Sequence, residues 1–141
     1  MADYLYEDEF IKLSFNEEMN CIIKDWQSEV SQEKFREIII VLLMKIIQVR
    51  MQHKNKSNNI FVDARKIGSK AFSEENMAWL DKDIHPVYGM NKIAKKAFFM
   101  SEDIASNLPV MKYITSNNNS TSGVAMNLFT NEEEAKAWLM S

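Results

Sequence analysis

The residues best suited to bind a ligand follow two segments that the sequence predicts to be strands. Because the carboxyl ends of parallel strands meet at one edge of a sheet, side chains that follow them should lie together, where open α/β sheets bind ligands. Cationic and hydroxyl donors at that edge suit a small anion or an acidic partner; the alternative is that they are solvated turn residues. The candidate ligand or anion residues are Arg65, Lys66, Ser69, Lys70 and Ser101.

Covalent catalysis is not indicated by the sequence. A nucleophile needs a base within reach and donors for an oxyanion, commonly on a glycine-rich turn. The three glycines are scattered, so they form no phosphate-binding loop and no nucleophile elbow. Cys21 lies in a predicted strand without a basic neighbour, which favours a packing role over a reactive thiol. We therefore expect no catalytic residues and no enzymatic activity.

Metal and nucleic-acid sites are weakly supported. Asp81 and His85 would share a helix face, but no second histidine completes a ligand set, so a solvated helix end is the simpler interpretation. Lys92, Lys95 and Lys96 form a basic cluster that we interpret as ordinary surface, because no aromatic platform is interleaved with it. We expect no metal, no cofactor and no nucleic-acid partner.

Composition predicts one soluble domain spanning residues 1–141. Of the 141 residues, 46% are hydrophobic and 26% charged, as is usual for a globular chain, and the formal net charge is -3. A single cysteine and an acidic N-terminus without a secretory signal favour the cytoplasm. The longest apolar run, residues 38–44, is too short to span a membrane.

Hydrophobic periodicity predicts an α/β fold that opens with a β-hairpin of strands 10–15 and 21–26. A helix capped by Ser31 should run to about His53, where the histidine caps it, and a buried strand should follow at 59–63. A helix from about Ser73 should end at His85-Pro86. The remaining expected elements are a strand at 96–100, a helix capped by residues 101–103 and kinked at Pro109, a mobile loop at 115–123, a strand at 124–129 and a helix with a capping box at Thr130 and Glu133.

The long helix carries two apolar stripes, and one sheet face can bury only one of them. A neighbouring helix of the same chain could cover the second stripe; alternatively, this stripe is a subunit or partner interface. The candidate interface residues are Ile40, Leu43, Met44, Ile47 and Met51. Lys54 to Asn58 should form a polar loop after the helix.

The order of elements and the final segment, residues 129–139 with Trp138 facing inward, resemble the STAS-like superfamily of anti-sigma-factor antagonists, and in particular small bacterial STAS-like proteins. The resemblance implies a mostly parallel sheet of about five strands with about four helices. It also implies kinship with lipid carriers of related topology. Regulatory members carry a phosphorylatable serine after the central strand; Ser69 and Ser73 lie near that place, but the Asp-Ser pair is absent, and a helix cap explains Ser73 better.

Two functions follow as hypotheses. The first is a non-enzymatic STAS-like module that acts through protein contacts and forms a homodimer. The second is a carrier of a small apolar or lipid-like ligand, which the 10 methionines would suit because their side chains line adaptable cavities.

Overall fold

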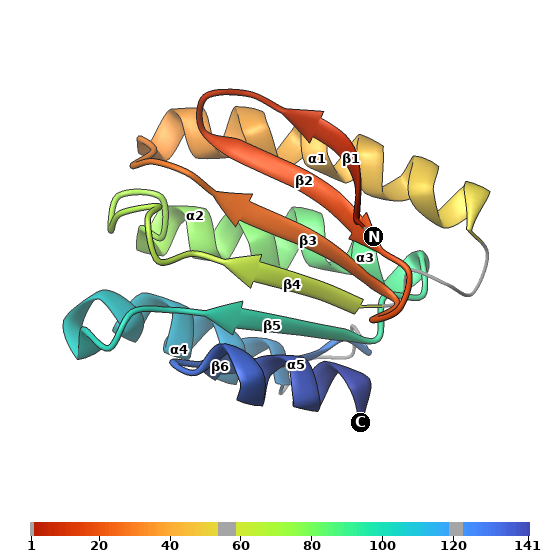
Figure 1. Cartoon of the computed structure of the whole chain (residues 1–141). Coiled ribbons are helices and arrows are strands. Elements are labelled where there is room, and N and C mark those ends of the chain that lie inside the picture. The colour runs from red at the N-terminus through yellow and green to blue at the C-terminus, as the bar shows by residue number, and fades with distance from the viewer. Residues whose placement is uncertain (1, 54–58, 119–122) are drawn as a thin grey trace.

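The computed structural model of the chain describes residues 2–53, 59–118 and 123–141, and it shows an α/β fold built on one sheet (Figure 1). The strands are β1 (Ala2–Glu7), β2 (Ile11–Asn16), β3 (Cys21–Trp26), β4 (Asn59–Asp63), β5 (Lys95–Phe99) and β6 (Ala125–Phe129). The helices are α1 (Gln32–Gln52), α2 (Glu74–Trp79), the π-helical turn η1 (Leu80–Ile84), α3 (His85–Met90), α4 (Ile104–Asn118) and α5 (Glu132–Met140).

The sheet is mixed, and its six strands lie in the order β1-β2-β3-β4-β5-β6. The first three strands pair antiparallel, and β3, β4, β5 and β6 pair parallel. The expected opening hairpin is therefore confirmed as β2 and β3. The expectation of five strands was one short, because β1 adds a third antiparallel strand at the edge.

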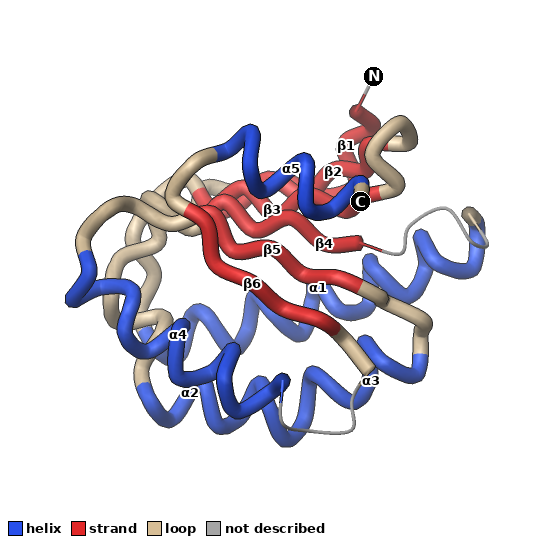
Figure 2. Tube along the Cα trace, turned by 90° about the horizontal axis from the view of Figure 1, so that it is seen from below, coloured by secondary structure: helices blue, strands red, loops and turns tan. Residues whose placement is uncertain are grey.

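The helices are divided unequally between the two faces of the sheet. Figure 2 shows α1 to α4 on one face and α5 alone on the other. Right-handed crossovers that always step in the same direction place every connecting helix on the same face, which accounts for the first group. The last helix follows β6 and turns back over the opposite face, where it contacts β4, β5 and β6.

Two predicted helix starts are confirmed by their caps. Ser31 Oγ accepts a hydrogen bond from the Lys34 amide at the start of α1, and Ser73 Oγ accepts one from the Asn76 amide at the start of α2. Each hydroxyl satisfies an amide that has no partner within its own helix. The predicted end of α1 is also confirmed, since His53 is the C-cap residue. His53 caps the helix with its backbone amide, which donates to the Val49 carbonyl. Its ring instead packs on Phe15, with 4.8 Å between the ring centres.

The predicted helix end at His85-Pro86 was wrong. The helical path continues from α2 through η1 into α3, and Pro86 lies in the first turn of α3. The π-helical turn explains the continuity, because its wider hydrogen bonding runs from the His85 amide to the Leu80 carbonyl. Proline is tolerated in a first turn, where an amide would lack a helical partner.

Two other boundaries differ from expectation, and one agrees with it. Helix α4 passes through Pro109 and extends to Asn118, so the expected loop begins later than residue 115; residues 119–122 of that loop, and the loop at 54–58, lie outside the described residues. The cap of α5 is Asn131, which accepts a hydrogen bond from the Glu134 amide, in place of Thr130. The expected cap of α4 by residues 101–103 is confirmed at Asp103, whose Oδ1 accepts a hydrogen bond from the Ala105 amide.

The sheet separates two hydrophobic clusters of different size. The larger lies between the sheet and α1 to α4 and includes fully buried Trp26, Phe35 and Leu42. The smaller lies under α5 and consists of Cys21, Phe61, Ala97, Phe99, Ala135 and Leu139, with Trp138 partly buried beside it. In the described part of the chain, no helix is long and apolar enough to cross a membrane.

Candidate functional site

The predicted ligand edge is hollowed, and it holds most of the predicted residues. Arg65, Ser69 and Ser101 line a cavity of about 210 Å³ at the carboxyl ends of β4 and β5. Ser69 also lines an adjoining cavity of about 240 Å³, together with Lys70. Lys66 lines neither cavity. The structure thus brings four of the five candidates to one edge.

The charges at this edge do not favour an anion. The Arg65 guanidinium donates two hydrogen bonds to the Asp63 carboxylate, of 3.0 and 2.8 Å, and lies 4.3 Å from the centre of the Phe99 ring. The hydrogen bonds to Asp63 raise the pKa of Arg65 further. Glu29 lines both cavities and adds a carboxylate where an anion would bind. The cation that should attract an anion is already neutralised.

A pair of aspartates at this edge was missed by the sequence analysis. Asp25 and Asp63 are register partners at the ends of β3 and β4. Burial raises the pKa of Asp25, and the charge of Asp63 raises it further. Asp25 is the next-to-last residue of one predicted strand and Asp63 the last residue of another. Their shared position at strand ends could have indicated the pair from the sequence. Ser73 is occupied as a helix cap, which leaves Ser69 as the exposed serine of the two phosphorylation candidates.

A second set of polar side chains lies deep beneath the helical layer. Lys24 on β3 is 1% exposed, and Lys96 on β5 is 3% exposed. The expectation that Lys96 belongs to a surface cluster was therefore wrong. Strand alternation explains its burial. Lys96 and Phe98 project to the face of the sheet that α1 to α4 cover, while Lys95 projects to the face that α5 covers. The same alternation placed Lys24 between the inward residues Ile22 and Trp26.

Aromatic rings surround both ammonium groups. A hydrogen bond of 2.6 Å joins Lys24 Nζ to the Tyr88 hydroxyl. Lys96 Nζ lies 5.2 Å from the Tyr88 ring centre, 4.9 Å from that of Phe98 and 5.9 Å from that of Tyr113. No hydrogen bond or ion pair reaches Lys96 from the residues that the structure describes. Cation–π contacts are thus its main polar interactions.

Burial shifts the proton equilibria of this cluster. Desolvation lowers the pKa of Lys96 to about 7 and that of Lys24 well below its usual value, with repulsion from Lys96 adding to the second shift. Desolvation, with repulsion from Lys96, also lowers the pKa of His85 to about 3. The nearby Asn117 side chain opposes that shift, yet neither ring nitrogen of His85 has a well-formed hydrogen bond within the described residues.

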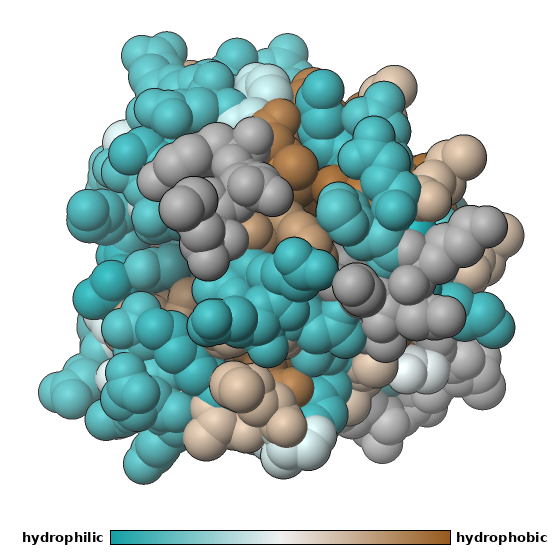
Figure 3. Space-filling model, turned by 45° about the vertical axis from the view of Figure 1, so that its right-hand side comes forward, coloured by the Kyte–Doolittle hydropathy of each residue, from teal (hydrophilic) through white to brown (hydrophobic). Residues whose placement is uncertain are grey.

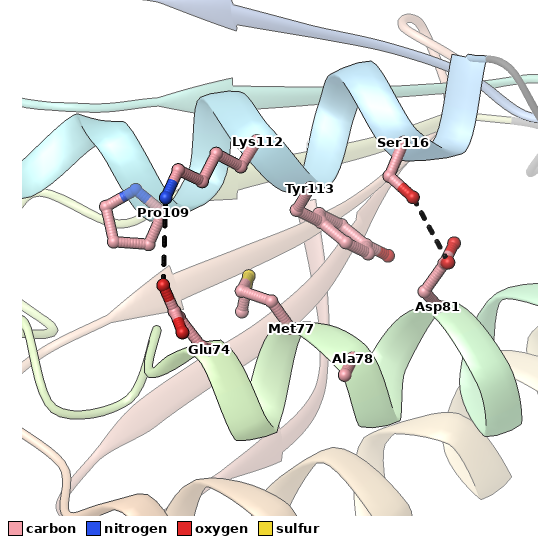
Figure 4. Close-up of a pocket in the computed structure, with 8 residues that line it drawn as sticks. All are labelled: Glu74, Met77, Ala78, Asp81, Pro109, Lys112, Tyr113 and Ser116. Atoms are coloured by element: carbon pink, nitrogen blue, oxygen red, sulfur yellow. Dashed lines mark hydrogen bonds and ion pairs between the residues drawn. The ribbon is translucent and has the colours of Figure 1, made fainter.

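A pocket of about 250 Å³ opens between α2 and α4, next to this buried cluster (Figure 4). Figure 4 shows side chains from both helices converging on it, with the Tyr113 ring reaching from α4 across to the opposite helix. Met77, Ala78 and Pro109 supply apolar walls. The polar lining residues are Glu74, Asp81, Lys112, Tyr113 and Ser116.

Tyr113 links the pocket to the buried lysines. Its ring lies 5.2 Å from that of His85, and the residue also lines the pocket. The residue is 3% exposed, and its buried hydroxyl makes no hydrogen bond to any part of the chain that the structure describes. Burial, with the charge of Asp81 among the further causes, raises the pKa of this hydroxyl well above its usual value. Tyr113 therefore carries a neutral hydroxyl that has no hydrogen-bond partner among the described residues, and the residue lines an open pocket.

The second apolar stripe of α1 remains uncovered by the described chain. Ile40 is 50% exposed, Met44 62% and Met51 71%, while Leu43 and Ile47 are partly buried. The alternative in which a neighbouring helix of this chain covers the stripe is wrong for Ile40, Met44 and Met51 within the described residues. Figure 3 shows one face of the molecule, on which hydrophilic side chains predominate and apolar ones reach the surface in places between them.

Cys21 and the predicted metal motif show no reactive arrangement. The Cys21 side chain is buried, and desolvation raises the pKa of its thiol to about 12. Of the predicted pair, His85 is buried, whereas Asp81 is partly exposed and its carboxylate accepts a hydrogen bond from the Ser116 hydroxyl. No cluster of three or more histidine, cysteine or acidic side chains suited to a metal occurs in residues 2–53, 59–118 and 123–141.

Comparison with known proteins identifies no relative: neither a family model, nor a curated protein, nor a solved structure matches the chain. The functional argument therefore depends on the fold and on the geometry of its sites. The sequence analysis missed the most distinctive of these sites, because Lys24, Lys96, His85 and Tyr113 are far apart in the chain and meet only under the helical layer.

Proposed function

We propose that this protein is a non-enzymatic binder of a small, partly apolar molecule, which occupies the pocket between α2 and α4. The pocket combines apolar walls with a few polar groups, as small-molecule sites usually do. Its volume of about 250 Å³ lies below the usual range for drug-sized ligands, which favours a compact molecule. The lipid-like cargo considered from the sequence is therefore limited to small ligands.

The observation that supports this proposal is the unpartnered hydroxyl of Tyr113. A buried polar group without a hydrogen bond costs about 1–3 kcal/mol, and such groups usually have a partner. Tyr113 lines the pocket, so a ligand that hydrogen-bonds to its hydroxyl would remove this cost. That gain would add to the burial of the ligand's apolar part against Met77 and Pro109.

The proposal is tested by screening a library of small fragments against the protein with ligand-observed NMR. We expect binders whose signals are lost in Ala78→Met, because the longer side chain fills the pocket from its α2 wall. Ala137→Met is the matched control, since Ala137 is also an exposed helical alanine but lies on α5. Binders that Ala78→Met leaves unaffected, or the absence of any binder, would contradict the proposal.

A second candidate function is protein interaction through the exposed stripe of α1, and the occupant that fits it is a second copy of this chain. The first turn of α1 carries Glu33 and its last turn Arg50. Two copies of α1 packed antiparallel would place opposite charges and opposite helix-dipole ends next to each other, with Ile40, Met44 and Met51 between them.

This interaction is tested by sedimentation velocity over a range of concentrations. We expect a dimer for the wild-type chain and a monomer for Met44→Lys, because a lysine in the centre of the stripe would bury a charge on association. Ala137→Lys, on the far side of the sheet, is the control and should leave the dimer intact. A wild-type chain that stays monomeric at high concentration would exclude the homodimer.

We also propose kinship with STAS-like proteins, supported by the order of the elements: hairpin, long helix, then alternating parallel strands and helices that end in a short capped helix. The sixth strand, β1, is an addition to the expected arrangement. Within such a fold, ligand binding and self-association can coexist, because α1 and the α2–α4 pocket use different residues.

A further inference from the structure

The charged side chains around the pocket differ in how completely ion pairs and hydrogen bonds from this chain satisfy them. Glu74 and Lys112 form an ion pair of 3.7 Å, and both side chains are largely exposed, at 86% and 74%. The Asp81 carboxylate accepts one long hydrogen bond of 3.4 Å from the Ser116 hydroxyl. Two carboxylates and one ammonium therefore face the pocket, which gives a net charge of -1 at its mouth. Asp81 is the group with the most unused acceptor capacity.

We infer that the ligand is a small organic amine, whose ammonium group lies between the Asp81 carboxylate and the Tyr113 hydroxyl. The inference rests on the proposed binding function and names the chemical class of its ligand. An ammonium group carries several donors, so it can bond to the carboxylate and to the hydroxyl oxygen at the same time. The Tyr113 ring adds a π surface that attracts a cation.

A carboxylic acid or phosphate fits this pocket less well. It would place its negative charge beside Asp81 and near Glu74. The buried lysines could offset that charge only from behind the Tyr113 ring, since Lys96 Nζ lies 5.9 Å from the ring centre on the sheet side. Lys24 is engaged by Tyr88. An anion would thus meet like charges first.

The apolar walls define the rest of the ligand. Met77, Ala78 and Pro109 line the pocket and offer no charge to a ligand. A ligand with one ammonium group and a compact apolar body, such as an arylalkylamine, would match both parts. Polyamines would leave their second charge against the apolar wall, where it costs free energy.

The buried lysines predict how binding depends on pH. Lys96 gains its proton as the pH falls through about 7, and its charge then repels a cation on the pocket side of Tyr113. The other groups that face Lys96 are Lys24, His85, Tyr88 and Tyr113, with Asp81 beyond the ring. His85, with a pKa of about 3, stays neutral between pH 6 and pH 8. Affinity for an amine should therefore be lower at pH 6 than at pH 8.

The experiment compares three probes of similar shape: benzylamine, benzyl alcohol and benzoate. Their binding to the full chain is measured by protein-observed NMR titration at pH 8 and pH 6. Asp81→Asn removes the carboxylate charge at nearly constant shape, and Asp83→Asn is the matched control, since Asp83 is exposed on the same turn outside the pocket. Lys96→Met tests the origin of the pH dependence.

We expect benzylamine to bind more tightly than benzyl alcohol, and benzoate to bind most weakly. Asp81→Asn should weaken benzylamine by about tenfold or more, as the loss of a charge-assisted hydrogen bond does, whereas Asp83→Asn should not. Lys96→Met should abolish the weakening between pH 8 and pH 6. These results together would support an amine site.

Other outcomes separate the two proposals. Equal binding of benzylamine and benzyl alcohol that Asp81→Asn leaves unchanged would overturn the amine inference while preserving a ligand pocket. Preference for benzoate would overturn it as well. If no probe binds and no fragment binds in the screen described above, the binding function itself is wrong.

Discussion

Lys95 and Lys96 are neighbours on β5, and they meet opposite environments on the two faces of the sheet. On the α5 face, Lys95 Nζ donates to the Trp138 carbonyl at 2.9 Å and to the carbonyl of Ser141 at 2.8 Å. These carbonyls lie at the C-terminal end of α5, where a helix dipole favours a cation. On the other face, the polar contacts of the Lys96 ammonium among the described residues are with the rings of Tyr88, Phe98 and Tyr113.

The two faces therefore differ in how their lysines are satisfied: Lys95 has hydrogen-bond partners, whereas Lys96 is buried among aromatic rings. Under α5, the hydrophobic cluster includes the Cys21 thiol, and the buried polar residue beside it, Asn59, donates a hydrogen bond to the Leu139 carbonyl. The neighbouring Lys95 donates to the Trp138 carbonyl at the margin of this cluster. The cluster under α1 to α4 encloses two amines, a histidine and two tyrosines. A group that lowers stability and lies beside a pocket is typical of a functional site, which agrees with the binding proposal.

The largest expected effect comes from Lys96→Met. Replacing a buried charged group by an apolar side chain of similar length should raise the free energy of unfolding by about 1–4 kcal/mol at pH 6, because the cost of burying the amine disappears. Urea denaturation followed by circular dichroism measures it. A loss of stability of that size would show that the cation–π contacts of Lys96 outweigh its desolvation.

Tyr88→Phe, on the same face of the sheet, should lower the free energy of unfolding, whereas Lys96→Met should raise it. It removes the hydroxyl that bonds to Lys24 and leaves that buried amine without its partner. We expect a loss of about 2 kcal/mol in the same measurement. Phe98→Leu is a useful reference, since it removes a ring near Lys96 and leaves the Lys24 hydrogen bond intact. An unchanged stability in Tyr88→Phe would mean that Lys24 has no need of this hydroxyl.

The wild-type chain should become more stable as the pH rises from 7 to 9. The folded pKa of Lys96 is about 7 against a usual value of 10.5, so in this range the unfolded chain binds more protons and stability increases with pH. The slope should approach about 1.4 kcal/mol per pH unit for this lysine. Above pH 9, ionisation of Cys21 in the unfolded chain opposes the trend, because its folded pKa is about 12.

Lys96→Met provides the control for that slope. If the rise between pH 7 and pH 9 persists unchanged in the variant, another group is responsible. Lys24 is the first to consider, since its pKa is also lowered by burial.

The smallest effect is expected for Lys95→Met on the α5 face. It should lower the free energy of unfolding by about 1 kcal/mol, because the carbonyls at the end of α5 lose a cationic donor. Ser141 also bonds to the Trp138 carbonyl, which limits the loss. A stabilising effect like that of Lys96→Met would remove the contrast between the two faces.

Local patterns were sufficient to predict most of the fold. The alternation in β2 and β3, the 3.6-residue periodicity of α1 and the cap at Ser31 are all encoded by neighbouring residues. The path through Pro86 was not predictable in this way, because a single π-helical turn depends on the packing of η1 against its surroundings and not on its own sequence. Strand β1 was missed because its acidic residues are untypical of a strand. It is an edge strand that pairs with β2.

The candidate site was predictable only in part. The carboxyl edge of the sheet followed from topology, and it gathered Arg65, Ser69 and Ser101 as expected. The charges that count against an anion at this edge come from Asp63 and Glu29, whose distances to the candidates no local pattern gives. The pocket required the packing of α2 against α4, two helices separated by a whole strand in the sequence.

The simple strand order has a consequence for folding during synthesis. Every strand pairs with the one that precedes it in the chain, so the sheet can lengthen strand by strand as the ribosome delivers each segment. Such nearest-neighbour pairing keeps loop-closure costs low and favours fast assembly. The cluster of Cys21, Phe61 and Phe99 is covered later than its strands form, since α5, which covers it, follows β6 in the chain. A nascent chain would therefore expose this apolar face until α5 has left the exit tunnel.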